Sequence, residues 1–269
     1  MKTELNQLVV GIKGAGEMAS AVAWRLYLAN IKAIFMMETP QPSAVRRAVS
    51  FSEAVYKGSA TVEGVEAGKV EDADGIQAAW NKKAVAVLVD PHWTVVKTMH
   101  PQIVIDAILA KTNMGTATTE AALVIGLGPG FIAPTDVHMV IETNRGHNLG
   151  RIITDGGAES NTGIPGSIGG HAEQRVLRAP AEGLFKTRHS ITDLVKTGEV
   201  IGTVEEEKVL AGIDGILRGL IRSGSRVSKG FKIGDIDPRK DKSYCYTISD
   251  KARAIGGSVL EAIMRVYNV

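Results

Sequence analysis

The sequence has little cysteine, few aromatic residues and no excess of either charge. Its one cysteine, Cys245, excludes an internal disulfide and indicates a reducing, cytosolic compartment. Lysine and arginine (31) nearly balance aspartate and glutamate (29), and no basic run forms, which argues against nucleic acid as a partner. No apolar run reaches the ~18 residues of a membrane span, and Met1–Gln7 is too polar for a signal peptide. We therefore expect a cytoplasmic protein with neither a nucleic-acid nor a membrane partner.

The first half of the chain alternates short aliphatic runs with amphipathic stretches, which is the pattern of strand–helix–strand units around a parallel sheet. Strands are predicted at Leu8–Lys13, Ala33–Glu38, Ala84–Val89, Ile103–Ala107, Leu123–Leu127 and His138–Glu142. Helices are predicted at Glu17–Asn30, Ser43–Tyr56, Asp74–Asn81 and Thr94–Met99, with a hairpin inserted at Thr61–Glu71. The predicted fold class is α/β, with a Rossmann-like, doubly wound parallel sheet in a nucleotide-binding domain at residues 1–150.

The pattern changes after residue 150. Residues 151–174 are rich in glycine, above all at Gly156–Gly170, and are interpreted as a linker or lid, or as part of a subunit interface in a homo-oligomer. A period of two then predicts a small all-β module at residues 175–248, with strands at Val200–Val204, Lys208–Ile213, Gly215–Ile221, Lys232–Ile236 and Ser243–Ile248. Residues 249–269 predict a C-terminal helix, Asp250–Tyr267, that begins at Ser249 or Asp250 and packs back on the protein.

The first glycine loop carries Gly-x-Gly-x-x-Ala between a predicted strand and a predicted helix. Gly14 permits the tight turn, Gly16 lets a phosphate approach the backbone, and Ala19 lets helix and strand pack closely. The N–H groups of the helix start, at Glu17 and Met18, would face that phosphate. Glu38 ends the next strand, where an acid accepts hydrogen bonds from ribose hydroxyls and disfavours a 2′-phosphate. The loop and its acid predict a dinucleotide site, although an inherited loop that binds nothing would look the same.

Polar residues follow the later strands, at the edge where ligands of open α/β sheets bind. Asp90, Gly128 and Gly130 are assigned to cofactor binding, the two glycines because their N–H groups could hold an anion. The candidates for proton transfer are Lys111, His138 and Glu142, of which the last two share a strand face. Two such ligands are too few for a metal, so none is predicted. The remaining rim residues are Asn113, Asn144, Arg145 and His147.

Several of these segments together resemble one protein family. The matching segments are Lys13–Ser20, Ser50–Tyr56, Gly126–Phe131, Glu142–His147 and Gly234–Arg239. They resemble accessory proteins of the selenium-dependent molybdenum hydroxylase system, and the glycine loop is similar to that of accessory proteins for xanthine dehydrogenase and carbon monoxide dehydrogenase. The stretch Val209–Asp235 is more loosely similar to half of a lipoyl or biotinyl domain, which implies a barrel-sandwich-hybrid-like module.

Three functions remain open on this evidence. The resemblance implies a maturation factor that binds a molybdenum hydroxylase apo-enzyme and either NAD or a molybdopterin dinucleotide. This maturation factor is the favoured interpretation, and the glycine loop and Glu38 also permit an NAD-dependent oxidoreductase as an alternative. A non-catalytic adaptor, in which the glycine loops are only structural, is the third alternative. Whether the protein catalyses a reaction at all is therefore left open by the sequence.

Overall fold

The computed structural model describes residues 4–161, 163 and 166–268 and divides the chain into two units. Unit 1 comprises Met1–Pro42, Ser50–Asn161 and Ile248–Val269, and unit 2 comprises Ser43–Val49 and Thr162–Thr247. Some residues of the predicted segments lie outside the described residues: 1–3 of the polar N-terminal segment, 162, 164 and 165 of the glycine-rich segment, and 269.

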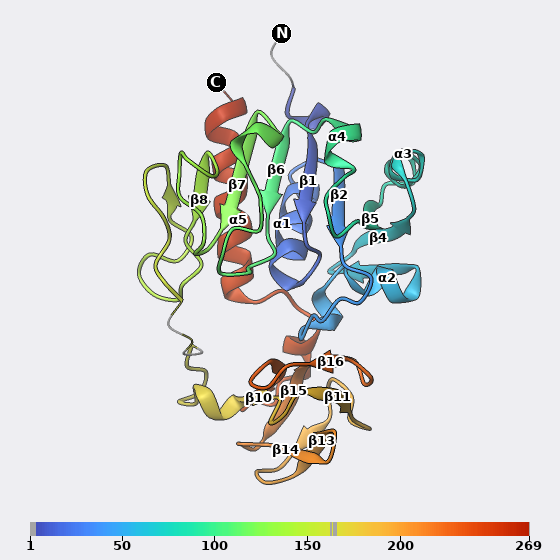
Figure 1. The fold of residues 1–269 in the computed structure, drawn as a ribbon, viewed down its shortest axis with the longest axis vertical. Helices are drawn as coiled ribbons and strands as arrows, with labels where there is room; N and C mark the ends of the chain where they lie inside the picture. Colours follow the sequence, from blue (N-terminus) through green and yellow to red (C-terminus); the bar gives the residue numbers. More distant parts are fainter. Residues whose placement is uncertain (1–3, 162, 164–165, 269) are drawn as a thin grey trace. The chain divides into compact units, whose positions relative to one another are not determined.

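Unit 1 is built on a nine-stranded mixed sheet in the order β3-β4-β5-β2-β1-β6-β7-β8-β9 (Figure 1). The strands from β4 to β8 in this order are parallel, whereas the edge strands β3 and β9 pair antiparallel with their neighbours. This confirms the α/β class, but the sheet is mixed and larger than predicted, because the hairpin joins it and β9 adds a further edge. The strands are β1 Val9–Lys13, β2 Ala33–Glu38, β3 Ser59–Val62, β4 Val65–Val70, β5 Val85–Val89, β6 Ile103–Asp106, β7 Leu123–Leu127, β8 Met139–Ile141 and β9 Ile152–Ile153.

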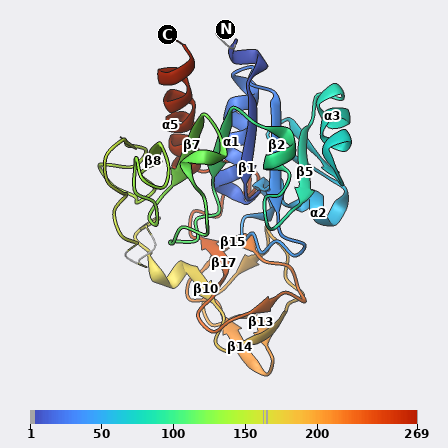
Figure 2. The ribbon, with the colours of Figure 1, turned by 45° about the horizontal axis from the view of Figure 1, so that its top comes forward.

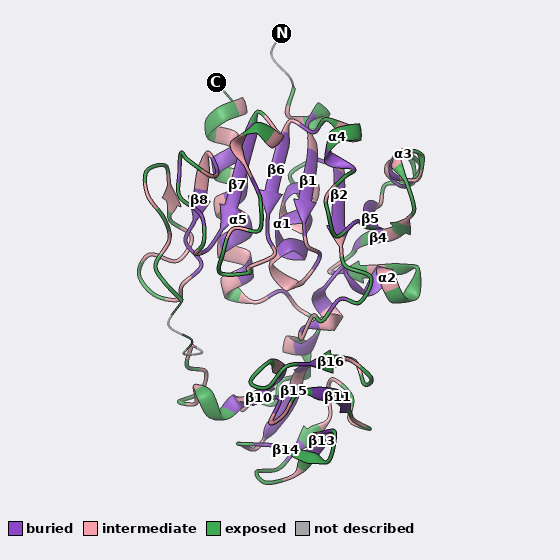
Figure 3. Ribbon diagram, viewed as in Figure 1, coloured by how far each residue is buried: buried purple, intermediate pink, exposed green. Residues whose placement is uncertain are grey.

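Helices cover the buried strands of this sheet, which Figure 3 shows in purple. Phe35 and Met37 of β2 lie in one apolar cluster with Val104 of β6 and with Ile76 of α3. The helices α1 and α5 lie side by side (Figures 1 and 2), so close that a Cβ at Gly256 would lie 3.0 Å from the carbonyl oxygen of Ala21. Among the described residues, every helix is too short or too polar to cross a bilayer. The helices are α1 Glu17–Leu28, α2 Glu53–Lys57, α3 Ala73–Asn81, α4 Val96–Met99 and α5 Asp250–Tyr267.

The predicted helix Ser43–Tyr56 is wrong, because its two halves belong to different units. Residues 43–49 lie in unit 2, where Arg46 donates to the carbonyl oxygens of Tyr244 and Thr247, both at 2.9 Å. Residue 50 begins the next segment of unit 1, and within the predicted range the α-helix is limited to the residues of the short α2. Tertiary hydrogen bonds thus override a helical pattern of apolar residues.

Unit 2 consists of two four-stranded antiparallel sheets, in the orders β10-β17-β15-β12 and β14-β13-β11-β16. The predicted strand Ser243–Ile248 is wrong: a 3₁₀ helix forms at Lys242–Cys245 instead. The Asp241 carboxylate accepts hydrogen bonds from the N–H and the hydroxyl of Ser243, which draws the chain out of an extended conformation. The strands are β10 Val176–Arg178, β11 Gly183–Lys186, β12 Leu194–Val195, β13 Val200–Val204, β14 Glu207–Leu210, β15 Gly215–Leu220, β16 Arg226–Val227 and β17 Lys232–Asp237.

Candidate functional site

The first glycine loop joins β1 to α1 at the centre of the large sheet. Gly14 has φ +88°, a conformation that L residues rarely adopt. Gly16 is the N-cap of α1 and carries no side-chain cap, and a Cβ added to it would meet nothing within 4 Å. The first turn of α1, from Glu17 to Ala19, follows directly. The loop therefore offers open space beside helix N–H groups, where the helix dipole favours an anion.

Glu38 lies against this loop. One of its carboxylate oxygens accepts the N–H of Ala15 at 2.9 Å, and the other accepts the N–H of Thr39 at 2.8 Å. Each carboxylate oxygen has a second lone pair, so Glu38 can still accept hydroxyl donors from a ligand. The sequence assigns Glu38 and the glycine loop to one site, and in the structure they are in direct contact.

The strand order changes direction at this point of the sheet. β1 pairs in parallel with β2 on one side and with β6 on the other, so the strand order runs outward from β1 in both directions and the segments after β1, β2 and β6 begin at the same edge of the sheet. Open α/β sheets bind ligands at such an edge. Asp90, after β5, is buried there, and its carboxylate accepts the N–H of Val95 at 2.8 Å and the hydroxyl of Thr94 at 3.1 Å. Asp90 therefore shapes the chain leading into α4.

The second glycine loop is packed against its neighbours. A Cβ at Gly128 would lie 2.5 Å from the hydroxyl of Thr143, and one at Gly130 would lie 2.8 Å from the backbone N of Thr112. Both glycines have positive φ, so the backbone conformation of this tight turn is enough to explain why glycine occupies both positions. Lys111, in the facing segment, is exposed. Asn113 folds its own loop, since its side-chain oxygen accepts the N–H groups of Gly115 and Thr116.

The structure does not bring His138 and Glu142 together. His138 precedes β8, and its Nδ1 accepts the N–H of Val124 at 3.0 Å, at the start of β7. Glu142 follows β8, is buried, and accepts the N–H groups of Asn144 at 2.6 Å and Glu159 at 2.7 Å. Among the described residues, no group of three or more His, Cys, Asp or Glu side chains could hold a metal.

Residues after Glu142 form hydrogen bonds with the segment that follows β9. The side-chain amides of Asn144 and Asn148 donate to the two carboxylate oxygens of Glu159, at 2.7 and 2.9 Å. These hydrogen bonds, Asn148 first, hold the pKa of Glu159 below its usual range. Arg145 forms a bidentate ion pair with Asp250, and His147 is exposed. A polar cavity of about 380 Å³ is lined by Glu142, Asn148, Arg151, Ile152, Ile153, Thr154, Asp155, Gly157 and Glu159.

Sequence reasoning missed a buried polar network at the same edge of the sheet. Lys13, fully buried at the end of β1, donates to the hydroxyl of Thr116 at 2.7 Å and to Glu120 at 2.8 Å. Its ammonium lies 4.2 Å from the ring centroid of Trp93. The Thr116 hydroxyl in turn donates to Asp106, the residue that pairs with Lys13 in the β1–β6 register, at 2.7 Å. In the sequence, this network could have been recognised from Lys13, a charged residue at the end of a strand that is otherwise apolar.

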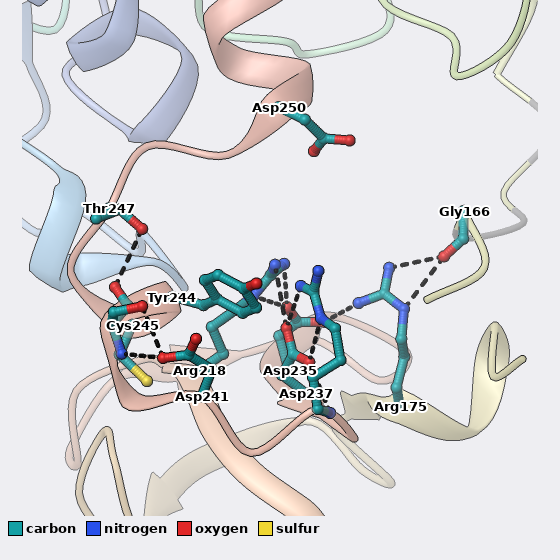
Figure 4. A network of polar contacts seen from close by, with 12 residues as sticks. Gly166, Arg175, Arg218, Asp235, Asp237, Asp241, Tyr244, Cys245, Thr247 and Asp250 are labelled. Carbon is teal, nitrogen blue, oxygen red and sulfur yellow. Dashed lines mark hydrogen bonds and ion pairs between the residues drawn. The ribbon is translucent and has the colours of Figure 1, made fainter. Parts of the chain in front are cut away.

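Unit 2 contains a second buried charge network (Figure 4). The Asp235 carboxylate, 1% exposed, pairs with the guanidinium groups of Arg175 and Arg218. Burial on its own raises the pKa of Asp235, but the charges of Lys232, Arg218 and Arg175 outweigh it and hold the pKa below its usual range. Arg175 also donates to the carbonyl oxygen of Gly166, so the network joins β15 and β17 to the segment before β10.

Asp237 and Cys245 complete this part of unit 2. Burial also raises the pKa of Asp237, but hydrogen bonds from Arg239 outweigh it, and the net pKa is lowered. The Cys245 thiol is buried, lies 3.8 Å from the carbonyl oxygen of Leu217, and has its pKa raised by burial. A buried thiol with a raised pKa is a poor nucleophile, which agrees with a structural role for Cys245.

Comparison with known proteins gives a curated relative. No protein-family model matches the chain. The chain is 48% identical over 263 residues to the uncharacterized protein YqeB of Escherichia coli K12. That match covers 98% of this chain and 48% of YqeB, so the chain spans about half the length of the curated relative.

Three solved structures show a weak likeness to the chain. A succinylglutamate desuccinylase/aspartoacylase from Rhodobacter sphaeroides is 29% identical over 24% of this chain and 22% of its own, with a TM-score of 0.21. An aspartoacylase family protein from Mesorhizobium loti is 12% identical over 79% of this chain and 58% of its own, with a TM-score of 0.24. The ectoine utilization protein EutE from Ruegeria pomeroyi is 9% identical over 84% of this chain and 56% of its own, also at 0.24. Scores this low give no basis for transferring an activity.

These comparisons overturn the family resemblance drawn from the sequence. The relative named above is an uncharacterized protein, the solved structures named above are a desuccinylase/aspartoacylase, an aspartoacylase family protein and an ectoine utilization protein, and none of these is described as an accessory protein of a molybdenum hydroxylase or as an NAD-dependent oxidoreductase. The molybdenum, selenium and maturation expectations are therefore corrected. The physical reason is that glycine motifs follow from backbone geometry: Gly14, Gly128 and Gly130 have positive φ, and a Cβ at Gly126 would lie 2.5 Å from the ring of Phe131. Unrelated sheets share such constraints.

Proposed function

We propose that unit 1 binds a nucleotide at the carboxyl edge of its sheet, in the manner of a Rossmann-like fold. The diphosphate would lie over Gly16 at the N-terminus of α1, and the ribose hydroxyls would donate to Glu38. The observation that carries this proposal is the open space at Gly16, next to a carboxylate already held against the loop by the N–H of Ala15.

The chemistry of the loop favours a particular class of nucleotide. Glu38 and Glu17 both carry negative charge beside the loop, so a ribose with a free 2′-hydroxyl is preferred to one with a 2′-phosphate. We therefore expect NAD or an adenine nucleotide to bind more tightly than NADP. The proposal concerns binding alone and assigns no reaction.

The same proposal extends to the finer description of the fold. In unit 1 the order β5-β2-β1-β6-β7-β8 within the larger sheet corresponds to that of a doubly wound dinucleotide-binding domain. The two antiparallel sheets of unit 2 are compatible with a barrel-sandwich hybrid. We propose no ligand for unit 2.

Calorimetric titration of the full chain with NAD, NADP, ATP and CTP tests the proposal. The diagnostic variant is Gly16→Asp, because Asp is a favoured N-cap residue and its Cβ meets nothing within 4 Å. Its carboxylate would cap α1 itself and repel a diphosphate, so affinity should fall at least about tenfold, or ~1.4 kcal/mol. Gly257→Asp in α5 is the matched control, since that site is equally open. A wild-type chain that binds none of the four nucleotides would contradict the proposal.

A further inference from the structure

The segment after β6 lies between the two glycine loops; we define Ala107–Glu120 as the strap. The N–H of Ala107 donates to the carbonyl oxygen of Lys13 at 3.0 Å. A Cβ at Gly14 would lie 3.4 Å from the carbonyl oxygen of Ala107, and one at Gly130 would lie 2.8 Å from the backbone N of Thr112. The strap backbone therefore packs against the first glycine loop near its start and against the second a few residues later.

The far end of the strap is fastened to the sheet through one buried cation. Lys13 binds Thr116 and Glu120, and Thr116 binds Asp106, so one lysine on β1 holds two strap residues. The second carboxylate oxygen of Glu120 is buried and, within the described part of the chain, has no hydrogen-bond partner. A buried acceptor without a donor is unfavourable, so the strap is less stable in this position than it would be with both Glu120 oxygens hydrogen-bonded.

The backbone in the middle of the strap is strained. Leu109 has φ +62° and Lys111 has φ +68°, both in the left-handed region that side chains disfavour. Within the described residues, 109–112 form no hydrogen bond to the rest of the chain. Such backbone strain persists where surrounding contacts enforce it, and it is concentrated at sites that switch. Here the enforcing contacts are the two glycine loops and the Lys13 cluster.

We propose that Lys13 is the latch of the strap, and that its release opens the edge of the sheet between the two glycine loops. The consequence for ligands rests on the proposed nucleotide site. A Cβ at Gly16 meets nothing within 4 Å, and a mononucleotide held there would not extend to Gly128 and Gly130, so it leaves the strap in place. A dinucleotide that extends toward Gly128 and Gly130 has to displace the strap. The latch therefore controls the entry of dinucleotides and leaves that of mononucleotides unchanged.

Hydrogen–deuterium exchange of the full chain tests the latch without any ligand. The variants are Lys13→Met, Thr116→Val and Glu120→Gln, with the exposed Lys97→Met as control. Exchange in peptides covering 107–120 should be at least tenfold faster in the three latch variants, while β1 and β6 change less than twofold. Thr116→Val removes only the bridging hydroxyl, so the test stands even if Lys13→Met does not fold. Unchanged strap exchange, or equal acceleration in β6, would overturn the proposal.

Stopped-flow binding of NAD and AMP tests the consequence of opening. Association of NAD should be at least threefold faster in Thr116→Val than in wild type, and association of AMP should be the same in both. If the wild type binds neither compound while strap exchange responds, the nucleotide site is refuted and the latch stands. If NAD binds and strap exchange does not respond, the latch is refuted and the nucleotide site stands.

Discussion

The carboxylate of Glu38 accepts the backbone N–H of Ala15 at 2.9 Å, which joins the end of β2 to the loop after β1. Through this contact a single acid both shapes the glycine loop and presents a negative charge beside the open position of Gly16. The same contact gives the proposed nucleotide site its expected preference, since a carboxylate accepts hydroxyl groups and repels phosphate.

Replacing Glu38 should change the choice of nucleotide. Glu38→Ala removes charge-assisted hydrogen bonds to the ribose, so NAD affinity should fall by about 1.5–3 kcal/mol. NADP affinity should fall less or rise, because the repulsion of its 2′-phosphate is removed. Titration of both compounds measures the ratio, with the exposed Glu66→Ala as control. An equal loss for NAD and NADP would show that Glu38 only supports the loop.

The buried network of unit 2 should be far more important for stability than an exposed ion pair. Asp235→Asn leaves Arg175 and Arg218 without their shared carboxylate, which should cost about 3–5 kcal/mol in the free energy of unfolding. Asp214→Asn breaks the exposed pair with Lys196, which solvent screens, and should cost far less stability than Asp235→Asn. Urea unfolding, followed by a spectroscopic probe in unit 2, measures the free energy of unfolding of both variants. Similar losses for both variants would mean that the buried network contributes no more than the surface pair.

The pH dependence of unit 2 follows from the same carboxylates. The pKa values of Asp235 and Asp237 are lowered in the folded state, so folding favours their ionised forms. Their contribution to stability is present above the unfolded pKa of about 3.9 and is lost as pH falls through the lower folded pKa. The melting temperature of unit 2 in the wild type should therefore fall as the pH drops below about 4. In Asp235→Asn the melting temperature should fall less over the same pH range. If the melting temperatures of the two proteins fall equally with pH, the pH dependence does not come from Asp235.

Two adjacent glycines of α5 should respond oppositely to alanine. A Cβ at Gly257 meets nothing within 4 Å, so Gly257→Ala should stabilise the protein by about 0.5–1 kcal/mol through helix propensity. A Cβ at Gly256 would lie 3.0 Å from the Ala21 carbonyl oxygen in α1, which cannot move freely. Gly256→Ala should therefore destabilise by about 1–3 kcal/mol. Thermal unfolding of both variants is the measurement, and a gain for Gly256→Ala would show that the two helices can separate without cost.

Much of unit 1 was predictable because its signals are local. The aliphatic run Ala33–Glu38 forms β2 with the predicted bounds, since β propensity and burial act on the same residues. The helix Asp250–Tyr267 begins and ends as predicted, with the Ser249 side chain accepting the N–H of Ala252. The hairpin turn at Glu63 and Gly64 has two positive φ values, as a two-residue turn of type I′ requires.

The candidate site was predictable only in part. Gly14, Gly16 and Glu38 follow from a motif whose spacing reflects one supersecondary unit, and the structure brings them together. His138 and Glu142 share a strand face but lie at its two ends, and each binds backbone close to its own position. A strand rises about 3.3 Å per residue, so two side chains four positions apart share a face but lie about 13 Å from each other, too far to act on one proton.

The sequence by itself determined the parallel strands of unit 1, the positions of the glycine loops and the helix that closes unit 1, because propensity, period and capping depend on neighbours in the chain. Only the tertiary structure decided that residues 43–49 join unit 2 and that Lys13 holds Thr116 and Glu120. These outcomes depend on partners about a hundred or more positions away, such as Thr116 for Lys13 and Tyr244 for Arg46. A buried charge is tolerated only where distant groups satisfy it, and no local pattern records which groups those are.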